Sequence, residues 1–279
     1  MIVGIDVGGS TTKAVAYRGR IVGKASVVTT EPYAAAAGAL AKLFMDMQKS
    51  LDEIRCVALT GGSSRAMPQT LLNLPVRKVD EMRAIGLGGL ELTQKEQALV
   101  VSMGTGTAIL AVRDGGESIR HVAGTAVGGG TLVGLSRCLL NKYEPESLWK
   151  LARKGNLRRV DLSVRDITGG SVGFLPADAT ASNFGRISDD ATQEDLALGI
   201  VNLVGQTIGT IASLAAKANG LEDDVVLVGK VAANPEITKI ILSVGRLYGV
   251  QMVVPENPDY CTALGAAVDA KALNGNEAS

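Results

Sequence analysis

The chain has 279 residues, 46% of them hydrophobic, which is enough for a sizeable buried core in one or two domains. Its 28 basic and 28 acidic residues cancel, so a general binder of nucleic acid or another polyanion is not expected. Three separated cysteines (Cys56, Cys138 and Cys261) indicate reduced thiols. The sequence has no uninterrupted apolar stretch of about 18 residues, so we expect no membrane span. The N-terminus enters a strand pattern at once, and we expect no secretion signal. We therefore expect a soluble, cytoplasmic α/β protein.

Short β-branched runs alternate with longer helical patterns along the chain. Strands are predicted at residues 2–6, 13–17, 21–27, 54–59, 98–102, 107–112, 225–228 and 251–254. Helices are predicted at residues 33–47, 67–72 and 82–92, in a long stretch after Asp190 that Gly220 ends, and after Asn234 as N-cap. This alternation favours an α/β fold.

Residues 2–17 and 98–112 share one pattern, a strand, a glycine turn and a second strand, each followed by helical material. Two such units predict two similar lobes with a cleft between them. Because no linker separates the lobes, we predict the boundary near residue 115, which divides the chain into lobes 1–115 and 116–279.

The first glycine turn has the composition of a phosphate loop. Its glycines let backbone N–H groups approach an anion, and its hydroxyls and lysine add donors. Asp6, at the end of the strand, could hold Mg²⁺ beside the phosphates. The candidate ligands are Asp6, Gly8, Gly9, Ser10, Thr11, Thr12 and Lys13. An ordinary glycine-rich hairpin is the alternative, because the segment fits neither the P-loop nor the dinucleotide pattern.

Three further glycine segments follow in order. Residues 102–107 (SMGTGT) form a second turn, and residues 124–131 (GTAVGGGT) open a helix that runs to Leu140. Such a helix start is a natural anion site. The fourth segment, residues 225–229, is an apolar strand that ends in glycine and could pass beneath a nucleotide base. Four such segments in this order predict a nucleotide site.

Asp80 and Glu81 are candidates for the base that would activate an alcohol as nucleophile. They stand where a short strand enters a helix. The chemistry of the two side chains does not choose between them, and acids in the first turn of a helix can simply complement its dipole.

The ordered loops resemble the actin, Hsp70 and sugar-kinase superfamily of ATP-binding proteins, and within it type II pantothenate kinases. The similarity covers nearly the whole chain. Its motifs are GIDVGGSTTK (4–13), LTGGSS (59–64), LVVSMGTGTAIL (99–110), VAGTAVGGGTLVGL (122–135), LARKGNLRRVDLSVRDITGG (151–170) and LPADATASNFG (175–185). The last two are the most specific. The resemblance implies a two-lobed actin-like (ribonuclease H-like) ATPase fold with a central interlobe cleft.

The same resemblance implies a function: ATP- and Mg²⁺-dependent phosphorylation of the primary hydroxyl of pantothenate, the first step of coenzyme A synthesis. Glu81 matches the catalytic acid of the family, which favours it over Asp80. Nucleotide contacts are implied for the first loop, for Thr105, and for Gly129, Gly130, Thr131, Leu132 and Val133.

Two positions depart from the family pattern. Where relatives commonly carry an arginine that binds pantothenate, this chain has His121, with Arg120 beside it. A neutral histidine cannot replace the fixed fork of an arginine, so Arg120 takes over that contact or the acceptor differs. Lys230 stands where relatives tend to carry a small polar residue, and could reach a phosphate or remain in solvent.

Other functions stay open at this point. They are a sugar or small-alcohol kinase of the same superfamily, a reductase-activating ATPase with an iron–sulfur cluster, and a nucleotide-binding filament protein. The family also implies a homodimer through the long helix after Asp190, although the apolar face of that helix could equally belong to the core.

Overall fold

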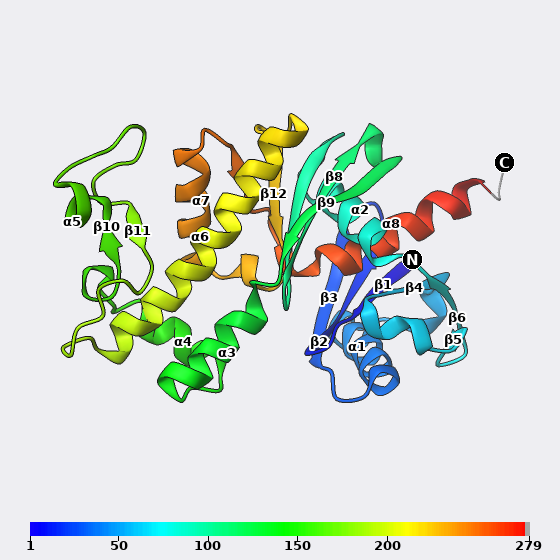
Figure 1. Ribbon diagram of the computed structural model, residues 1–279. Helices are drawn as coiled ribbons and strands as arrows, with labels where there is room; N and C mark the ends of the chain where they lie inside the picture. Colours follow the sequence, from blue (N-terminus) through cyan, green and yellow to red (C-terminus); the bar gives the residue numbers. More distant parts are fainter. Residues whose placement is uncertain (277–279) are drawn as a thin grey trace. The chain divides into compact units, whose positions relative to one another are not determined.

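The protein is described by a computed structural model covering residues 1–276 (Figure 1). The strands are β1 (Ile2–Val7), β2 (Thr11–Tyr17), β3 (Ile21–Val28), β4 (Cys56–Thr60), β5 (Thr70–Leu71), β6 (Leu74–Lys78), β7 (Ala98–Met103), β8 (Thr107–Arg113), β9 (Ser118–Thr125), β10 (Leu162–Ser163), β11 (Thr180–Ser182), β12 (Val225–Val228) and β13 (Met252–Val253). The α-helices are α1 (Pro32–Met47), α2 (Glu81–Thr93), α3 (Gly129–Leu140), α4 (Pro145–Ala152), α5 (Val164–Thr168), α6 (Gln193–Asn219), α7 (Pro235–Leu247) and α8 (Cys261–Asn276). Short 3₁₀ turns are η1 (Leu51–Glu53), η2 (Gly62–Ala66), η3 (Asp114–Gly116), η4 (Leu157–Arg159), η5 (Val231–Ala233) and η6 (Pro258–Tyr260). The predicted α/β class is confirmed.

The helix predicted over residues 67–72 is wrong. The 3₁₀ turn η2 ends at Ala66, and the following residues form the short strand β5. Pro68 disfavours helical backbone at Met67, whose ψ is 151°. Leu72 and Asn73, between β5 and the antiparallel β6, have φ of 51° and 63°. Two successive left-handed residues are typical of a tight two-residue hairpin, which explains why the segment folds back instead of continuing as a helix.

The chain forms two compact units that are discontinuous in sequence. Unit 1 contains residues 1–100, 110–121 and the chain from Pro255 onward, and unit 2 contains residues 101–109 and 122–254. This division differs from the single boundary predicted near residue 115, because strands β7, β8 and β9 cross between the units and α8 returns to unit 1.

Close backbone contacts explain why α8 belongs to unit 1. A Cβ built on Gly265 of α8 would lie 1.7 Å from the Ala84 carbonyl oxygen of α2. A Cβ on Gly4 of β1 would lie 1.9 Å from the Ala263 carbonyl oxygen. Only glycine allows such approaches, so the C-terminal helix packs directly on the backbone of the first strand and of α2.

The sheet of unit 1 has the order β3-β2-β1-β4-β6-β5. Strand β1 is antiparallel to β2 and parallel to β4, and β4 is parallel to β6. Alternate residues face opposite sides: Val3, Ile5 and Val7 pack in the cluster that includes residues of α1, whereas Ile2 packs in the cluster that includes residues of α8. The sheet is therefore buried on both faces.

Helix α6 is the centre of unit 2. It begins at a capping box of Thr192 and Asp195 and ends at Gly220, and α7 follows the predicted N-cap Asn234. By length and composition α6 could cross a membrane, but 61% of its apolar window is buried inside the protein, as in the core helix of a soluble protein. Among the large apolar side chains of α6, that of Leu214 is exposed, with a relative exposure of 53%. Most of the apolar surface of this helix is thus core.

Candidate active site

Three polar residues meet at one end of the sheet of unit 1. Asp6 on β1 lies opposite Lys13 on β2 and opposite Thr60 on the parallel strand β4. Residues that lie opposite one another in adjacent strands face the same side of a sheet, and this is the side covered by α8 and α2. The carboxyl ends of the parallel strands β1 and β4 are where ligands bind in open α/β sheets. The geometry therefore brings predicted site residues to an expected ligand position.

The first glycine turn is a tight connection between β1 and β2. Its residues Gly8, Gly9, Ser10 and Thr11 are partly or fully exposed, so they remain accessible to a ligand. Thr12 differs: it is fully buried, and its hydroxyl shares a 2.9 Å hydrogen bond with the Thr29 hydroxyl. The Thr12 side chain therefore ties β2 to the end of β3, and its backbone pairs within the sheet with Val7 and Val27, so Thr12 is not placed to bind a phosphate.

Lys13 is held by the 3₁₀ turn η6. Its ammonium donates to the Asp259 carbonyl oxygen at 2.7 Å and lies 3.7 Å from the Asp259 carboxylate. The centroid of the Tyr260 ring lies 5.8 Å from Lys13 Nζ and 5.4 Å from Lys24 Nζ. These contacts fix the Lys13 ammonium beside Asp6.

The start of α2 distinguishes the two candidate bases. Asp80 is the N-cap, and its carboxylate accepts a 3.0 Å hydrogen bond from the Arg83 backbone N–H. Glu81 is the first residue of the helix and is exposed. Asp80 therefore has a structural role as the helix cap, whereas the exposed carboxylate of Glu81 is accessible to the hydroxyl of a substrate.

Burial and a neighbouring acid make Asp6 hard to ionise. Burial raises the pKa of Asp6 to about 6, with a further contribution from the charge of Glu81, while Lys13 acts in the opposite direction. Burial, and then the charge of Asp6, also raises the pKa of the Cys261 thiol at the start of α8. The buried thiol therefore favours its protonated form. Asp6 and Glu81 thus belong to one electrostatic cluster, and a bound cation would reduce the repulsion between their carboxylates.

Sequence reasoning missed Thr60, Asp259 and Tyr260. Thr60 Oγ1 is buried and has no hydrogen-bond partner within the described part of the chain. Thr60 lies in the motif LTGGSS (59–64), at the end of a strand and before Gly61 and Gly62, but this motif indicated no role for the Thr60 side chain. Asp259 and Tyr260 reach the site from the far end of the chain, and no local pattern connects them with Lys13.

The other three glycine segments converge in unit 2. The amides of Gly129 and Gly130, at the start of α3, donate to the carbonyls of Gly104 and Thr105, both at 2.8 Å. A Cβ on Gly229, whose φ is +95°, would lie 2.5 Å from the Met103 carbonyl oxygen at the end of β7. Glycine is thus required because these loops touch backbone to backbone.

This packing changes the expected role of the start of α3. Because the Gly129 and Gly130 amides already donate within unit 2, they are not free donors for phosphate. Thr131 Oγ1 accepts from the Gly128 amide, and Leu132 is 2% exposed. Val133 is half-buried. At the predicted anion site, the amides of Gly129 and Gly130 are therefore not available to a phosphate.

Side chains at three other predicted positions reach solvent. Thr105 and Lys230 are exposed at the loops of unit 2, and Arg120 and His121 are exposed on β9. None of the four has a side-chain hydrogen bond or ion pair with residues 1–276. They are therefore free to contact a ligand.

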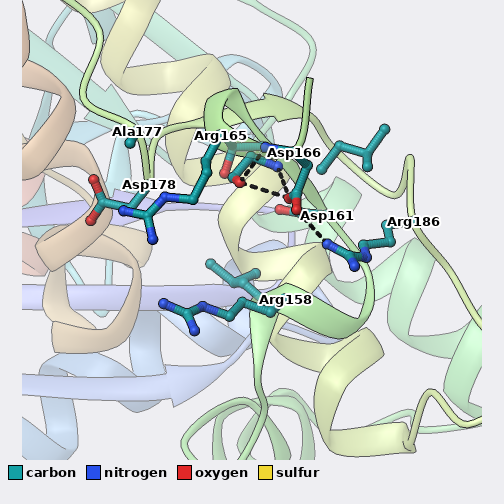
Figure 2. A pocket seen from close by; sticks show the side chains of 11 residues that line it. Arg158, Asp161, Arg165, Asp166, Ala177, Asp178 and Arg186 are labelled. Atoms are coloured by element: carbon teal, nitrogen blue, oxygen red, sulfur yellow. Dashed lines mark hydrogen bonds and ion pairs between the residues drawn. The ribbon is translucent and has the colours of Figure 1, made fainter. Parts of the chain in front are cut away.

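The most specific family segments line a separate pocket of about 340 Å³ in unit 2. Figure 2 shows Arg186 reaching toward Asp166. Arg186 Nη1 donates to Asp166 Oδ1 at 2.6 Å. Hydrogen bonds from Ser163 and the ion pair with Arg186 lower the pKa of Asp166 to about 2. The lining holds three arginines and three aspartates, so its formal charge is zero. The pocket has no excess charge that would select an ionic ligand.

Asp161 gives these segments a structural role. It is 4% exposed and accepts hydrogen bonds from the Phe184 N–H at 2.8 Å and from Asn202 Nδ2 at 2.7 Å. Phe184 has a φ of 58°, a strained conformation for an aromatic residue. The Asp161 carboxylate therefore joins the segment between η4 and β10 to the loop after β11 and to α6.

We expect Asp161→Asn to lower the free energy of unfolding by about 2–3 kcal/mol, because a buried donor loses its charged acceptor. Urea unfolding measures this effect. Asp178→Asn is the matched control, since Asp178 lines the same pocket but is exposed, and should change stability by less than about 0.5 kcal/mol. Equal effects of the two substitutions would contradict the structural role of Asp161.

Comparison with solved structures defines the class of fold. The activator of the 2-hydroxyisocaproyl-CoA dehydratase from Clostridium difficile, with bound ADPNP, superposes with a TM-score of 0.71 at 18% identity over 100% of this chain and 97% of that one. A ROK family glucokinase from Streptomyces griseus, in complex with glucose and AMPPNP, has a TM-score of 0.61 at 14% identity over 97% and 99% of the two chains. The predicted actin-like ATPase fold is confirmed.

Sequence comparison defines the family. The family model described as Fumble matches residues 91–268, more than half of the 279 residues. A type II pantothenate kinase from Bacillus cereus is 27% identical over 278 residues, covering 96% of this chain and 98% of that protein. The chain belongs to the Fumble family, and the resemblance to type II pantothenate kinases is confirmed.

Proposed function

We propose that this protein is an ATP-dependent kinase that transfers the γ-phosphoryl group of ATP to the primary hydroxyl of pantothenate. The full-length similarity to type II pantothenate kinases supports this proposal. The structural observation that carries it is an exposed carboxylate, Glu81, in the same electrostatic cluster as Asp6, while the neighbouring Asp80 is occupied as a helix cap.

The residues around Asp6 fit a hydrated Mg²⁺ ion. Mg²⁺ keeps several waters and takes one or two carboxylates. The Asp6 carboxylate accepts no side-chain hydrogen bond from residues 1–276, and the Thr60 hydroxyl beside it lacks a partner. Asp6 would hold the ion, which when bound neutralises charge on the transferred phosphoryl group.

The remaining steps use side chains of this protein. Glu81 orients the acceptor hydroxyl and takes its proton, which contributes roughly 10²–10⁴-fold to the rate. Lys13 donates to phosphate oxygens from a position fixed by Asp259. The exposed residues of the first turn offer amide and hydroxyl donors. In unit 2, the exposed side chains of Thr105 and Lys230 are proposed nucleotide contacts.

For the acceptor, we propose that Arg120 binds the pantothenate carboxylate. Its guanidinium is exposed and can form two parallel hydrogen bonds with a carboxylate. His121 adds a single donor beside it. The balanced charge of the chain supports the absence of nucleic-acid partners. We further propose that the enzyme acts as a cytoplasmic homodimer without membrane partners.

The acceptor is tested by measuring ADP release with pantothenate, pantetheine, pantoate and hexoses in parallel. We expect pantothenate-dependent release that exceeds the rate without acceptor by at least tenfold. Turnover with a hexose alone would identify a sugar kinase. Release that no acceptor stimulates would instead favour an ATPase that acts on another protein, the class suggested by the fold of the Clostridium difficile activator.

A further inference from the structure

Thr60 is a buried polar residue that the protein leaves unsatisfied. It ends β4, directly opposite Asp6 on β1, and its relative exposure is 0%. Its Oγ1 has no hydrogen-bond partner in the part of the chain that the structure describes. Buried hydroxyls in native proteins almost always have a partner, and an exception points to an unseen water or ion.

The surroundings of Thr60 are those of a ligand site. Thr60 and Asp6 face the same side of the sheet, where Lys13 also lies. The chain turns sharply after Thr60: Gly61 has a φ of +92°, and a Cβ built on it would lie 2.5 Å from Asp6 Oδ1. The end of β4 is therefore pressed against the carboxylate that is expected to hold the metal ion.

We propose that Thr60 is a positioning residue for metal binding, whose hydroxyl holds a water of the ion's hydration shell beside Asp6. This inference rests on the proposed function, because it takes the ligand to be a divalent cation with nucleotide. A hydroxyl can both donate and accept, so it can fix a water that also contacts the Asp6 carboxylate. Groups that orient metal ligands in this way typically change metal affinity by 10–100-fold.

A second buried hydroxyl provides a control. Ser136 Oγ on α3 is likewise buried and without a partner among the described residues, but it belongs to unit 2 and to a helix interior. Removal of either hydroxyl removes an unsatisfied polar atom. Only removal of the Thr60 hydroxyl should affect a metal ion near Asp6.

The test uses the full chain with Mn²⁺ as the probe. Free Mn²⁺ is measured by electron paramagnetic resonance during titration of the ADP complex of the wild type, Thr60→Val, Thr60→Ser and Ser136→Ala. We expect Thr60→Val to weaken Mn²⁺ binding by about 10–100-fold, Thr60→Ser to remain within about threefold of wild type, and Ser136→Ala to match it. Without ligands, Thr60→Val should unfold in urea at the same midpoint as the wild type or a higher one, since no hydrogen bond is lost.

Three results would overturn the inference. They are unchanged Mn²⁺ affinity in Thr60→Val, equal weakening in Ser136→Ala, and a lower urea midpoint for ligand-free Thr60→Val, which would mean that the hydroxyl has a partner within the protein. The titration contains no acceptor. A failure to phosphorylate pantothenate with an intact Thr60 effect would therefore refute the proposed substrate and leave the metal role standing.

Discussion

Glu81→Gln is expected to lower kcat with pantothenate by roughly 10²–10⁴-fold, the contribution of a positioned general base. Glutamine keeps the shape of the side chain but cannot accept a proton. Glu81 is exposed, so no core packing is lost, and Asp80 still caps α2. Loss of a charge in the first helical turn costs only about 0.3–1 kcal/mol. ADP release measures turnover, and calorimetric titration should give an ADP affinity close to that of the wild type.

Asp80→Asn is the matched control for this substitution. Asparagine is as good an N-cap as aspartate, so the hydrogen bond to the Arg83 amide can be kept while one charge is removed. We expect near-normal turnover in this variant. The opposite pattern, with Asp80→Asn inactive and Glu81→Gln active, would assign the base to Asp80 and reject the role given to Glu81.

The glycine loops show how far a sequence pattern reaches. Glycines predicted the turn between β1 and β2, and the helix that begins at Gly129, correctly. They did not reveal the partner of that helix start. A glycine permits close approach to a phosphate and to another backbone alike, and here the Gly129 and Gly130 amides bind the carbonyls of Gly104 and Thr105.

Long-range contacts are the second reason why the sequence could not predict the whole candidate site. Lys13 was predicted from its own loop, but its partner Asp259 is 246 positions away, on the segment that returns to unit 1 before α8. Thr60 became a candidate only when the register of β1 and β4 brought it opposite Asp6. Strand register depends on how the whole sheet pairs. Local composition could therefore identify Asp6 and Lys13 as candidates, but not the residues that surround them.

Asp6→Asn is expected to reduce turnover by at least about 100-fold and at the same time to stabilise the ligand-free protein. A metal ion contributes several kcal/mol of charge stabilisation to the transition state, and each 1.36 kcal/mol is tenfold in rate. The gain in stability arises because the Asp6 carboxyl, which is mostly shielded from water, has a pKa of about 6 in the folded chain, against a reference value of 3.8. Ionised Asp6 is thus a cost of the folded state, and asparagine removes it.

The pH dependence separates this effect from a change in packing. The folded chain holds its Asp6 proton more tightly than the unfolded chain, so the contribution of this group to stability is complete below about pH 4 and is lost as the pH rises through about 6. We expect Asp6→Asn to exceed the wild type in free energy of unfolding by roughly 1–3 kcal/mol at pH 8 and by about half as much at pH 5. Partial exposure of the Asp6 side chain places the expected difference toward the lower end of this range.

Urea unfolding of both proteins at the two pH values measures the difference in free energy of unfolding, and MgADP should stabilise the wild type more than the variant. Two results would contradict this prediction: an Asp6→Asn variant that is less stable than the wild type at pH 8, or a difference in free energy of unfolding that does not change with pH. Either would show that ionised Asp6 does not destabilise the ligand-free protein.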